Sequence, residues 1–376
     1  MLYTPPALEA VDHEVLGELD SLRESLRHQV SEPRRWTGAL RRTLIAAAIR
    51  GSNSIEGYQV TQDDAEAAVR GDDPLDTDSD TWSEITGYRD SLTYVQQLAD
   101  NEQFAWEQML LSALHFMLLR HHILIGPGRY RKGPIYVSDS TTGTVVYRGP
   151  EADRVPELVD ELCTGLAEDT TDLHVYVRAA MAHLNLVSIH PWRDGNGRMS
   201  RCLHTLVLAR DGVLAPEFSS IEEWLGTGRN TYDYYDALRD VQRGVFEPHG
   251  DTLSWVRFCL RAHHLQAQLV QQRFDAAGRL WSAVEDLVTA RGLPERTASV
   301  LFDAAMGSRV RRTGHQRDEH LTLDQAVRDL RELLRAGLLE QRGQTRGRHY
   351  VASDMLRDHV ADVRADLRPP RDPYAT

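Results

Sequence analysis

The stretch HPWRDGNGRMSR, at residues 190–201, constrains this chain more than any other part of its sequence. Apolar residues recur at helical spacing on both sides of it, over 172–189 and 196–211, so two buried helices are expected there. Between them the chain places a histidine, an aspartate, two glycines, an asparagine and three arginines. Two packed helices do not need these residue types at their junction, so we expect the junction to carry chemistry.

The residues in the first half of this stretch could accept a proton next to a bound anion. Pro191 ends the first helix and presents His190 there, and an imidazole can accept a proton from a hydroxyl group near neutral pH. The glycines at 195 and 197 allow backbone N–H groups to converge on an anion. Since the next helix begins at this point, its positive end also attracts negative charge.

The second half of the stretch adds fixed positive charge and a metal ligand. Arg198 and Arg201 lie three residues apart on the first turn of the helix, so both guanidinium groups can reach one polyphosphate. Asp194 precedes the glycines and is expected to hold a divalent cation against the same phosphates. A base, a metal ligand, an anion site and an arginine clamp together predict a phosphoryl or nucleotidyl transferase.

The same stretch resembles the Fic-family active-site motif, His-x-Phe-x-Asp/Glu-Gly-Asn-Gly-Arg-x-x-Arg, with Trp192 in place of the usual Phe. The resemblance implies transfer of AMP from ATP to a protein hydroxyl, with release of pyrophosphate. It implies that His190 deprotonates the target Ser, Thr or Tyr, and that Asp194 binds Mg²⁺. The phosphate-binding residues implied by the family motif are Gly195, Asn196, Gly197, Arg198 and Arg201.

Two further segments extend the resemblance. Residues 133–150 hold two β-branched runs around a Ser/Asp/Thr/Gly turn and are predicted to form a hairpin. This hairpin stands where Fic proteins carry a flap that docks the target protein, and an exposed strand edge can pair with an extended peptide. The segment GRNTYDYYDAL resembles the family's adenine-pocket segment, although a packed aromatic helix face is an open alternative. Its matching residues are Asn230, Tyr234 and Tyr235.

The segment GSNSIEGY, at 51–58, resembles the inhibitory motif of the family through Ser52, Glu56 and Gly57. A glutamate at the C-terminal end of a helix is unfavourable to the helix dipole, so a partner elsewhere is expected. In the family that partner is the second arginine of the motif, here Arg201, and the pairing implies a self-inhibited enzyme. An ordinary helix end is the alternative, and a role for the glutamate in removing AMP from a modified protein stays open.

The fold class predicted is mainly helical, with the hairpin flap and a small C-terminal winged helix-turn-helix. Past residue 276, helices lead to an arginine-rich loop, then to a helix capped by Thr322 and to two short strands at 338–341 and 349–352. The predicted units are an N-terminal region with the inhibitory helix (1–100), the catalytic core (101–273), the winged helix (276–355) and a tail (356–376).

Composition limits the setting in which the chain is expected to work. The net charge of −13 argues against a surface that binds nucleic acid throughout, but leaves room for one basic patch. No apolar run is long enough for a membrane span, and the three cysteines show no metal or disulfide spacing, so a cytoplasmic protein is predicted. Those cysteines are Cys163, Cys202 and Cys259.

The sequence thus predicts an autoinhibited protein adenylyltransferase that uses ATP and Mg²⁺ and docks its target protein on the 133–150 flap. One alternative is a DNA-binding regulator whose core only senses a nucleotide. Another is a related enzyme that removes AMP or transfers another nucleotide. A homodimer and DNA binding through the winged helix are left open as further partners.

Overall fold

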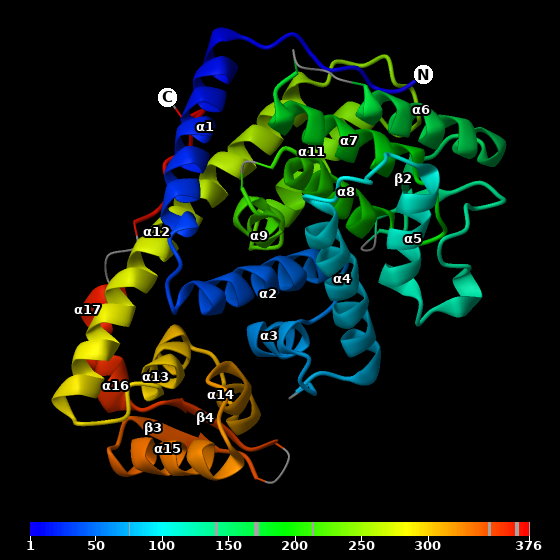
Figure 1. Ribbon diagram of the computed structural model, residues 1–376. Coiled ribbons are helices and arrows are strands. Elements are labelled where there is room, and N and C mark those ends of the chain that lie inside the picture. The colour runs from blue at the N-terminus through cyan, green and yellow to red at the C-terminus, as the bar shows by residue number, and fades with distance from the viewer. Residues whose placement is uncertain are drawn as a thin grey trace.

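The computed structural model describes residues 1–74, 76–139, 142–168, 173–212, 214–344, 347–364 and 368–375. Over these residues the fold is mainly helical, as predicted, and its strands form two small antiparallel hairpins (Figure 1). None of the helices in the described part of the chain combines the length and the apolar character needed to cross a membrane.

The N-terminal helices are α1 (Ala10–Ser31), α2 (Thr37–Ile55), α3 (Gln62–Arg70) and α4 (Ser79–Leu98). Helix α3 was not predicted, although Thr61 caps its start and Gly71, in the left-handed region, ends it. The next elements are α5 (Gln108–Leu119), β1 (Tyr136–Ser138), β2 (Val145–Arg148), α6 (Val155–Ala167), α7 (Val175–Ile189), α8 (Asn196–Arg210), α9 (Pro216–Ser219), α10 (Glu222–Leu225) and α11 (Asn230–Gln242). Single 3-10 turns lie at Ile123–Ile125 and Ala152–Arg154.

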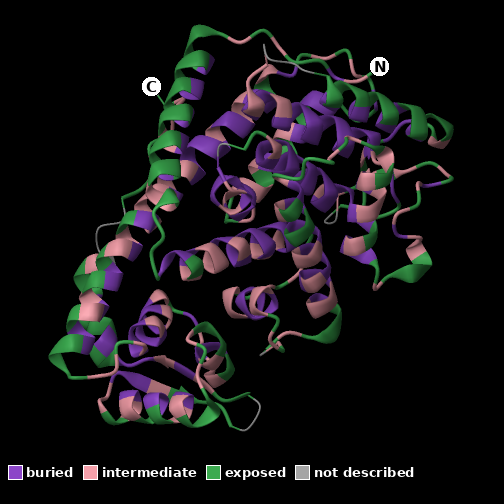
Figure 2. Ribbon diagram, in the orientation of Figure 1, coloured by how far each residue is buried: buried purple, intermediate pink, exposed green. Residues whose placement is uncertain are grey.

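Helices α7 and α8 lie at the centre of the main hydrophobic core. Nearly all of their side chains are buried, and Figure 2 shows both helices almost entirely in the colour of buried residues. Leu184, Ile189, Leu203 and Leu206 are fully buried, and each such side chain stabilises the fold by about 1.5–3 kcal/mol. The junction between these two helices therefore sits on a rigid support.

One long helix replaces two that the sequence pattern suggested. Helices were expected over 251–273 and 276–291, but α12 runs without a break from Leu253 to Ala290. The alanines around the expected break are strong helix formers, and Gly278 lies against the Trp36 ring. The helix joins the main core to a second cluster of buried apolar residues, which contains Trp36, Leu40 and Leu301.

The C-terminal module comprises α13 (Thr297–Met306), α14 (Arg312–Asp318), α15 (Leu323–Arg335), β3 (Leu339–Arg342), β4 (His349–Ala352), α16 (Asp354–His359) and α17 (Ala361–Arg364). Thr322 caps α15 as predicted. The arginine-rich segment before it is not a loop but contains α14, because His315 is buried there against Asp329. Apart from α14, the order of elements from α13 to β4 matches the prediction, and membership of the winged-helix class stays a prediction.

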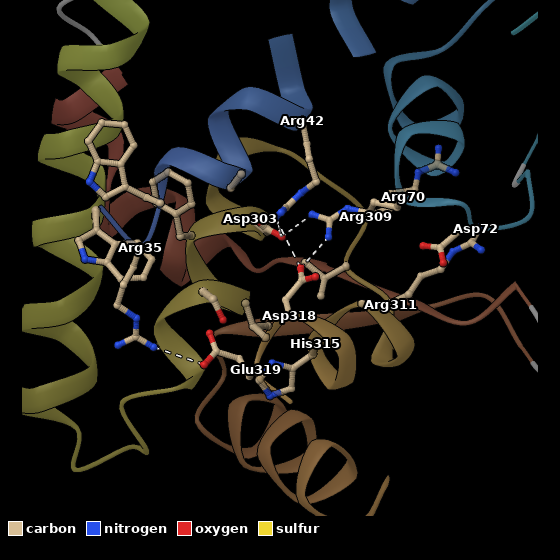
Figure 3. A pocket seen from close by; sticks show the side chains of 18 residues that line it. Arg35, Arg42, Arg70, Asp72, Asp303, Arg309, Arg311, His315, Asp318 and Glu319 are labelled. Atoms are coloured by element: carbon tan, nitrogen blue, oxygen red, sulfur yellow. Dashed lines mark hydrogen bonds and ion pairs between the residues drawn. The ribbon is translucent and has the colours of Figure 1, made fainter. Parts of the chain in front are cut away.

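The module packs against α2 and α3 across a cavity of about 210 Å³ (Figure 3). Arg70 at the end of α3 pairs with Asp303 at 2.6 Å and with Asp318 at 2.9 Å, and Arg42 of α2 approaches the same two carboxylates. Trp36, next to the start of α2, packs in the module's apolar cluster. The first half of α2 is therefore held by the C-terminal module, while its other end reaches the site described next.

Candidate active site

His190 ends α7 in a conformation that suits a proton acceptor. Its backbone has a φ of 51°, and its Nδ1 lies 3.0 Å from the Val187 carbonyl oxygen. Because a carbonyl only accepts, Nδ1 carries the proton and Nε2 has a free lone pair. Burial lowers the pKa of His190, so the imidazole is neutral near pH 7.

A second histidine, which the sequence did not single out, fixes the loop after His190. The His115 ring stacks on Trp192 with 4.4 Å between ring centroids, and its Nε2 lies 3.0 Å from the Asp194 carbonyl oxygen. Its Nδ1 accepts a hydrogen bond from Gly128 N, so Nε2 is the donor to Asp194. Burial lowers the pKa of His115 to about 4, which keeps this arrangement neutral.

The Asn196 side chain, which was assigned to phosphate binding, also holds the loop before α8. Its Oδ1 accepts from Trp192 N at 3.0 Å, and its Nδ2 donates to Trp192 O at 2.9 Å. The amide therefore closes the loop, and one N–H of Nδ2, together with the backbone N–H of Asn196, remains for an anion. Gly195 has a φ of 75°, and a Cβ there would lie 2.7 Å from the Leu119 side chain.

The start of α8 has the features of an anion-binding site, and the carboxylate of Glu56 lies over it. The first N–H groups of a helix have no partner within the helix, and Gly195 offers no side chain to cap them. A Cβ on Gly197 would lie 2.6 Å from Glu56 Oε1, so the carboxylate rests directly over this turn.

The three residues Ser52, Glu56 and Arg201 come together as the motif predicted. Arg201 Nη2 donates to Glu56 Oε1 at 2.6 Å and to Ser52 O at 3.0 Å, and Nε donates to Ser52 Oγ at 2.7 Å. Gly57, with a φ of 90°, ends α2 and turns the chain away just after the glutamate. Burial alone would raise the pKa of Glu56, but the charges of Arg201 and Arg198 lower it, so the carboxylate is ionised.

Arg198 is held by a carboxylate that sequence reasoning missed. Its Nη1 donates to Glu84 Oε2 of α4, and the Tyr58 hydroxyl donates to Glu84 Oε1 at 2.9 Å. Burial would raise the pKa of Glu84, but His121 and Arg198 lower it to about 2. Within the described residues, the buried Nε of Arg198 and Nη1 of Arg201 have no hydrogen-bond partner, so each is available to a ligand.

Asp194 fits the role of a metal ligand. Its side chain is exposed, and its Oδ1 accepts a hydrogen bond of 2.6 Å from Gly195 N. Among the described residues it forms no ion pair, so carboxylate oxygen remains for a hard cation such as Mg²⁺.

The predicted hairpin is present as β1 and β2, with residues 140 and 141 outside the described part of the chain, and its role as a flap that docks a target stays a prediction. Arg131, which was not predicted, joins the base of the hairpin to the site. It donates to Gly133 O and Pro150 O, and its Nε donates to His190 O at 2.8 Å. The hairpin is therefore anchored at the residue expected to act as the base.

The three residues assigned to the adenine pocket do not share one open surface. Tyr234 is 1% exposed, and its hydroxyl lies 2.9 Å from His183 Nε2, so its ring belongs to the core and is not accessible to adenine. The Asn230 side chain donates to Trp224 O, which fixes the start of α11. Tyr235 is partly exposed and donates to Ile55 O of α2, next to the inhibitory turn.

Comparison with known proteins agrees with this geometry. Residues 106–208 match the Fic/DOC family. The chain is 27% identical over 269 residues to the protein adenylyltransferase Fic of Nematostella vectensis, and 31% identical over 254 residues to that of Drosophila melanogaster. These alignments cover 68% and 65% of this chain but 55% and 47% of the relatives. The chain thus spans about half the length of the curated relatives it matches.

Solved structures show the same fold. A Fic family protein from Desulfovibrio desulfuricans G20 has a TM-score of 0.60 at 22% identity, with 93% of this chain and 98% of that one covered. Fic-1 from C. elegans has a TM-score of 0.55 at 23% identity, over 72% of this chain and 73% of the other. With the family match and the arrangement around His190, these likenesses lead to one conclusion: this chain carries a Fic/DOC-family domain over residues 106–208.

Proposed function

We propose that this chain is a protein adenylyltransferase that its own Glu56 holds in an inhibited state. It would transfer AMP from ATP to a Ser, Thr or Tyr hydroxyl of a target protein, and to itself as a side reaction. The observation that carries the proposal is the position of the Glu56 carboxylate, over the first turn of α8 and 2.6 Å from Arg201. A carboxylate at an anion site competes with a phosphate for the same donors.

In the proposed reaction, Nε2 of His190 takes the proton of the target hydroxyl. The hydroxyl oxygen then forms a bond to the α-phosphorus of ATP, and the bond from that phosphorus to the bridging oxygen breaks, so pyrophosphate leaves. The N–H groups at the start of α8 and the guanidinium groups of Arg198 and Arg201 would bind the phosphates. Asp194 would hold Mg²⁺, which neutralises phosphate charge when bound.

The target segment would pair with β1. In the described part of the hairpin, β1 pairs with β2 alone, while the far edge of β2 already contacts the chain near Val245. Tyr136 and Val145 expose large apolar surfaces on this hairpin. Backbone pairing would place an extended peptide beside His190 with little dependence on its side chains.

The test is transfer of label from ATP carrying a labelled α-phosphate, with cell lysate as the acceptor. Glu56→Gly should label protein strongly, the parent weakly, and Glu56→Gly/His190→Ala not at all. Glu32→Gly is the matched control, because Glu32 also caps the end of a helix but is exposed and pairs only with Arg34. Equal labelling by the folded parent and Glu56→Gly would overturn the inhibition, and no labelling by any variant would overturn the activity. Loss of label from a protein that already carries labelled AMP, when it is incubated with the parent or a variant, would identify removal of AMP.

A second candidate function, DNA binding, is favoured by one observation. Arg328, Arg331 and Arg335 lie on one exposed face of α15, and within the described residues none of them has a carboxylate partner. Three arginines on one helix face can contact successive phosphates. Salt-dependent binding of duplex DNA by the parent, lost when all three are changed to alanine, would support this role.

A further inference from the structure

A cluster of metal-ligating side chains lies next to the Fic site, on elements that the proposed reaction does not use. Glu84 comes from α4, and His121 and His122 follow the end of α5. Glu84 Oε1 lies 3.1 Å from His121 Nε2 and 3.0 Å from His122 Nε2, and one ligand atom from each residue lies within 4.8 Å of the other two. Three donors thus converge from α4 and from the turn after α5.

The geometry of these donors suits a small divalent metal ion. Zinc binds imidazole nitrogen at about 2.0–2.1 Å and carboxylate oxygen at about 2.0–2.2 Å, and tetrahedral angles then separate neighbouring donors by roughly 3.3 Å. The observed separations of 3.0 and 3.1 Å are within a few tenths of an ångström of that value. The buried Nε2 of His121 makes no hydrogen bond within the described residues, despite its short distance to Glu84, and a bound metal would satisfy it.

Burial is graded across the cluster in a way that leaves an entry path. The Glu84 side chain is 1% exposed, that of His121 19% and that of His122 47%. The carboxylate is ionised in its buried position, and the outer imidazole is open to solvent. We propose that Glu84, His121 and His122 form a binding site for a divalent transition-metal ion of the zinc class, with water as the fourth ligand.

The Glu84 carboxylate contacts the active-site motif through Arg198 and the segment after the inhibitory motif through Tyr58. Its Oε2 accepts from Arg198, and its Oε1 accepts from the Tyr58 hydroxyl, two residues after Glu56. A metal ion on Oε1 competes with Tyr58 for that oxygen and withdraws negative charge from the pair with Arg198. Metal binding therefore weakens the ion pair between Glu84 and Arg198. The residues involved are different from Asp194, which the proposed function assigns to Mg²⁺.

The experiment measures metal content and needs no nucleotide. The full chain is freed of metal with a chelator and dialysed against Zn²⁺ in the presence of millimolar Mg²⁺, and bound zinc is counted by mass spectrometry. We expect the parent to retain about one equivalent more zinc than His121→Ala or His122→Ala. The control His13→Ala/His28→Ala, which removes two exposed histidines of α1, should bind as the parent does. Zinc should also raise the Tm of the parent and not that of His122→Ala, because only the folded site binds.

Two results would overturn the proposal. One is equal zinc retention by the parent and His122→Ala, whose half-exposed side chain is not needed for folding. The other is displacement of the extra equivalent of zinc by Mg²⁺ during the dialysis. In either case the three side chains would form only a hydrogen-bonded cluster. Because the readout is zinc content and not AMP transfer, failure here is distinguishable from failure of the proposed enzyme activity.

Discussion

Ser52 offers a graded test of the proposed inhibition, because it holds the same arginine as Glu56 but does not reach the anion site. Its hydroxyl is fully buried and accepts a hydrogen bond of 2.7 Å from Arg201 Nε. Ser52→Ala leaves that buried, charged donor without an acceptor, which costs roughly 1.5–3 kcal/mol. If the loss falls on the inhibited state, the ratio of inhibited to active molecules falls by roughly 10- to 150-fold.

The assay is the initial rate of AMP transfer from ATP labelled at the α-phosphate. We expect the rate for Ser52→Ala to be higher than that for the parent and no higher than that for Glu56→Gly, because Glu56→Gly removes the proposed inhibition completely and so gives the maximum rate. The rate for Ser52→Ala/Glu56→Gly should equal that for Glu56→Gly, because both changes act on the same equilibrium between inhibited and active molecules. Ser54→Ala is the matched control on the same helix, since the Ser54 side chain makes no bond to Arg201.

Two outcomes would refute this reasoning. If Ser52→Ala lowers Tm but transfers AMP at the rate of the parent, Ser52 stabilises the fold without restraining the enzyme. If the double variant is much slower than Glu56→Gly, the Ser52 hydroxyl is needed in the active state, where it would hold Arg201 for the phosphates.

Four more predictions concern other contacts. In Glu56→Gly the acidic limb of kcat/KM against pH should have its midpoint below 6.5, because burial lowers the pKa of His190 and loss of the Glu56 charge lowers it further; a midpoint above 6.5 contradicts this. Since the pKa of Glu56 is lowered, the inhibitory pair should be lost only below pH 4.5, so labelling by the parent relative to Glu56→Gly at the same pH should not rise as the pH falls to 4.5; a rise above that pH contradicts this. His115→Ala removes a buried ring stack and should destabilise the chain by roughly 2–4 kcal/mol in thermal unfolding, so a loss under about 0.5 kcal/mol would show that the loop does not depend on it. Asp303→Asn removes the carboxylate charge that Arg42 of α2 approaches, as well as the pair with Arg70, and should raise AMP transfer as well as lower Tm; a fall in Tm alone would show that the C-terminal module does not restrain α2.

The parts of the site that the sequence predicted are those with a local signal. The motif at 190–201 lies between two apolar helices, and the β-branched runs at 133–150 flank a clear turn, so the helix pair and the hairpin follow from the residue pattern alone. The contact between Glu56 and Arg201 was reached because the family resemblance supplied a partner 145 residues away. Without it, the pattern shows only a glutamate in an unfavourable place.

The residues that the sequence missed act across long separations. Glu84 and Arg198 are 114 residues apart, and Arg131 and His190 are 59 apart, so no window of sequence contains both members of either pair. His115 lies in an apolar helix, where a buried histidine gives no periodic signal. Helix α14 was missed for another reason, since its charged sequence resembles a loop and only packing against α15 makes it helical.

Glu56 shows how one unfavourable residue can couple two parts of a fold. At the C-terminal end of α2 its charge opposes the dipole of its own helix, but the same carboxylate lies at the N-terminal end of α8, where the dipole and Arg201 favour it. Withdrawal of α2 therefore leaves the glutamate with an unfavourable dipole and leaves the α8 terminus without its anion. A phosphate can supply that anion. If Glu56 inhibits as proposed, binding of ATP in a productive position and release of α2 are expected to occur together, and the contacts of Arg42 of α2 with Asp303 and Asp318 would oppose that release.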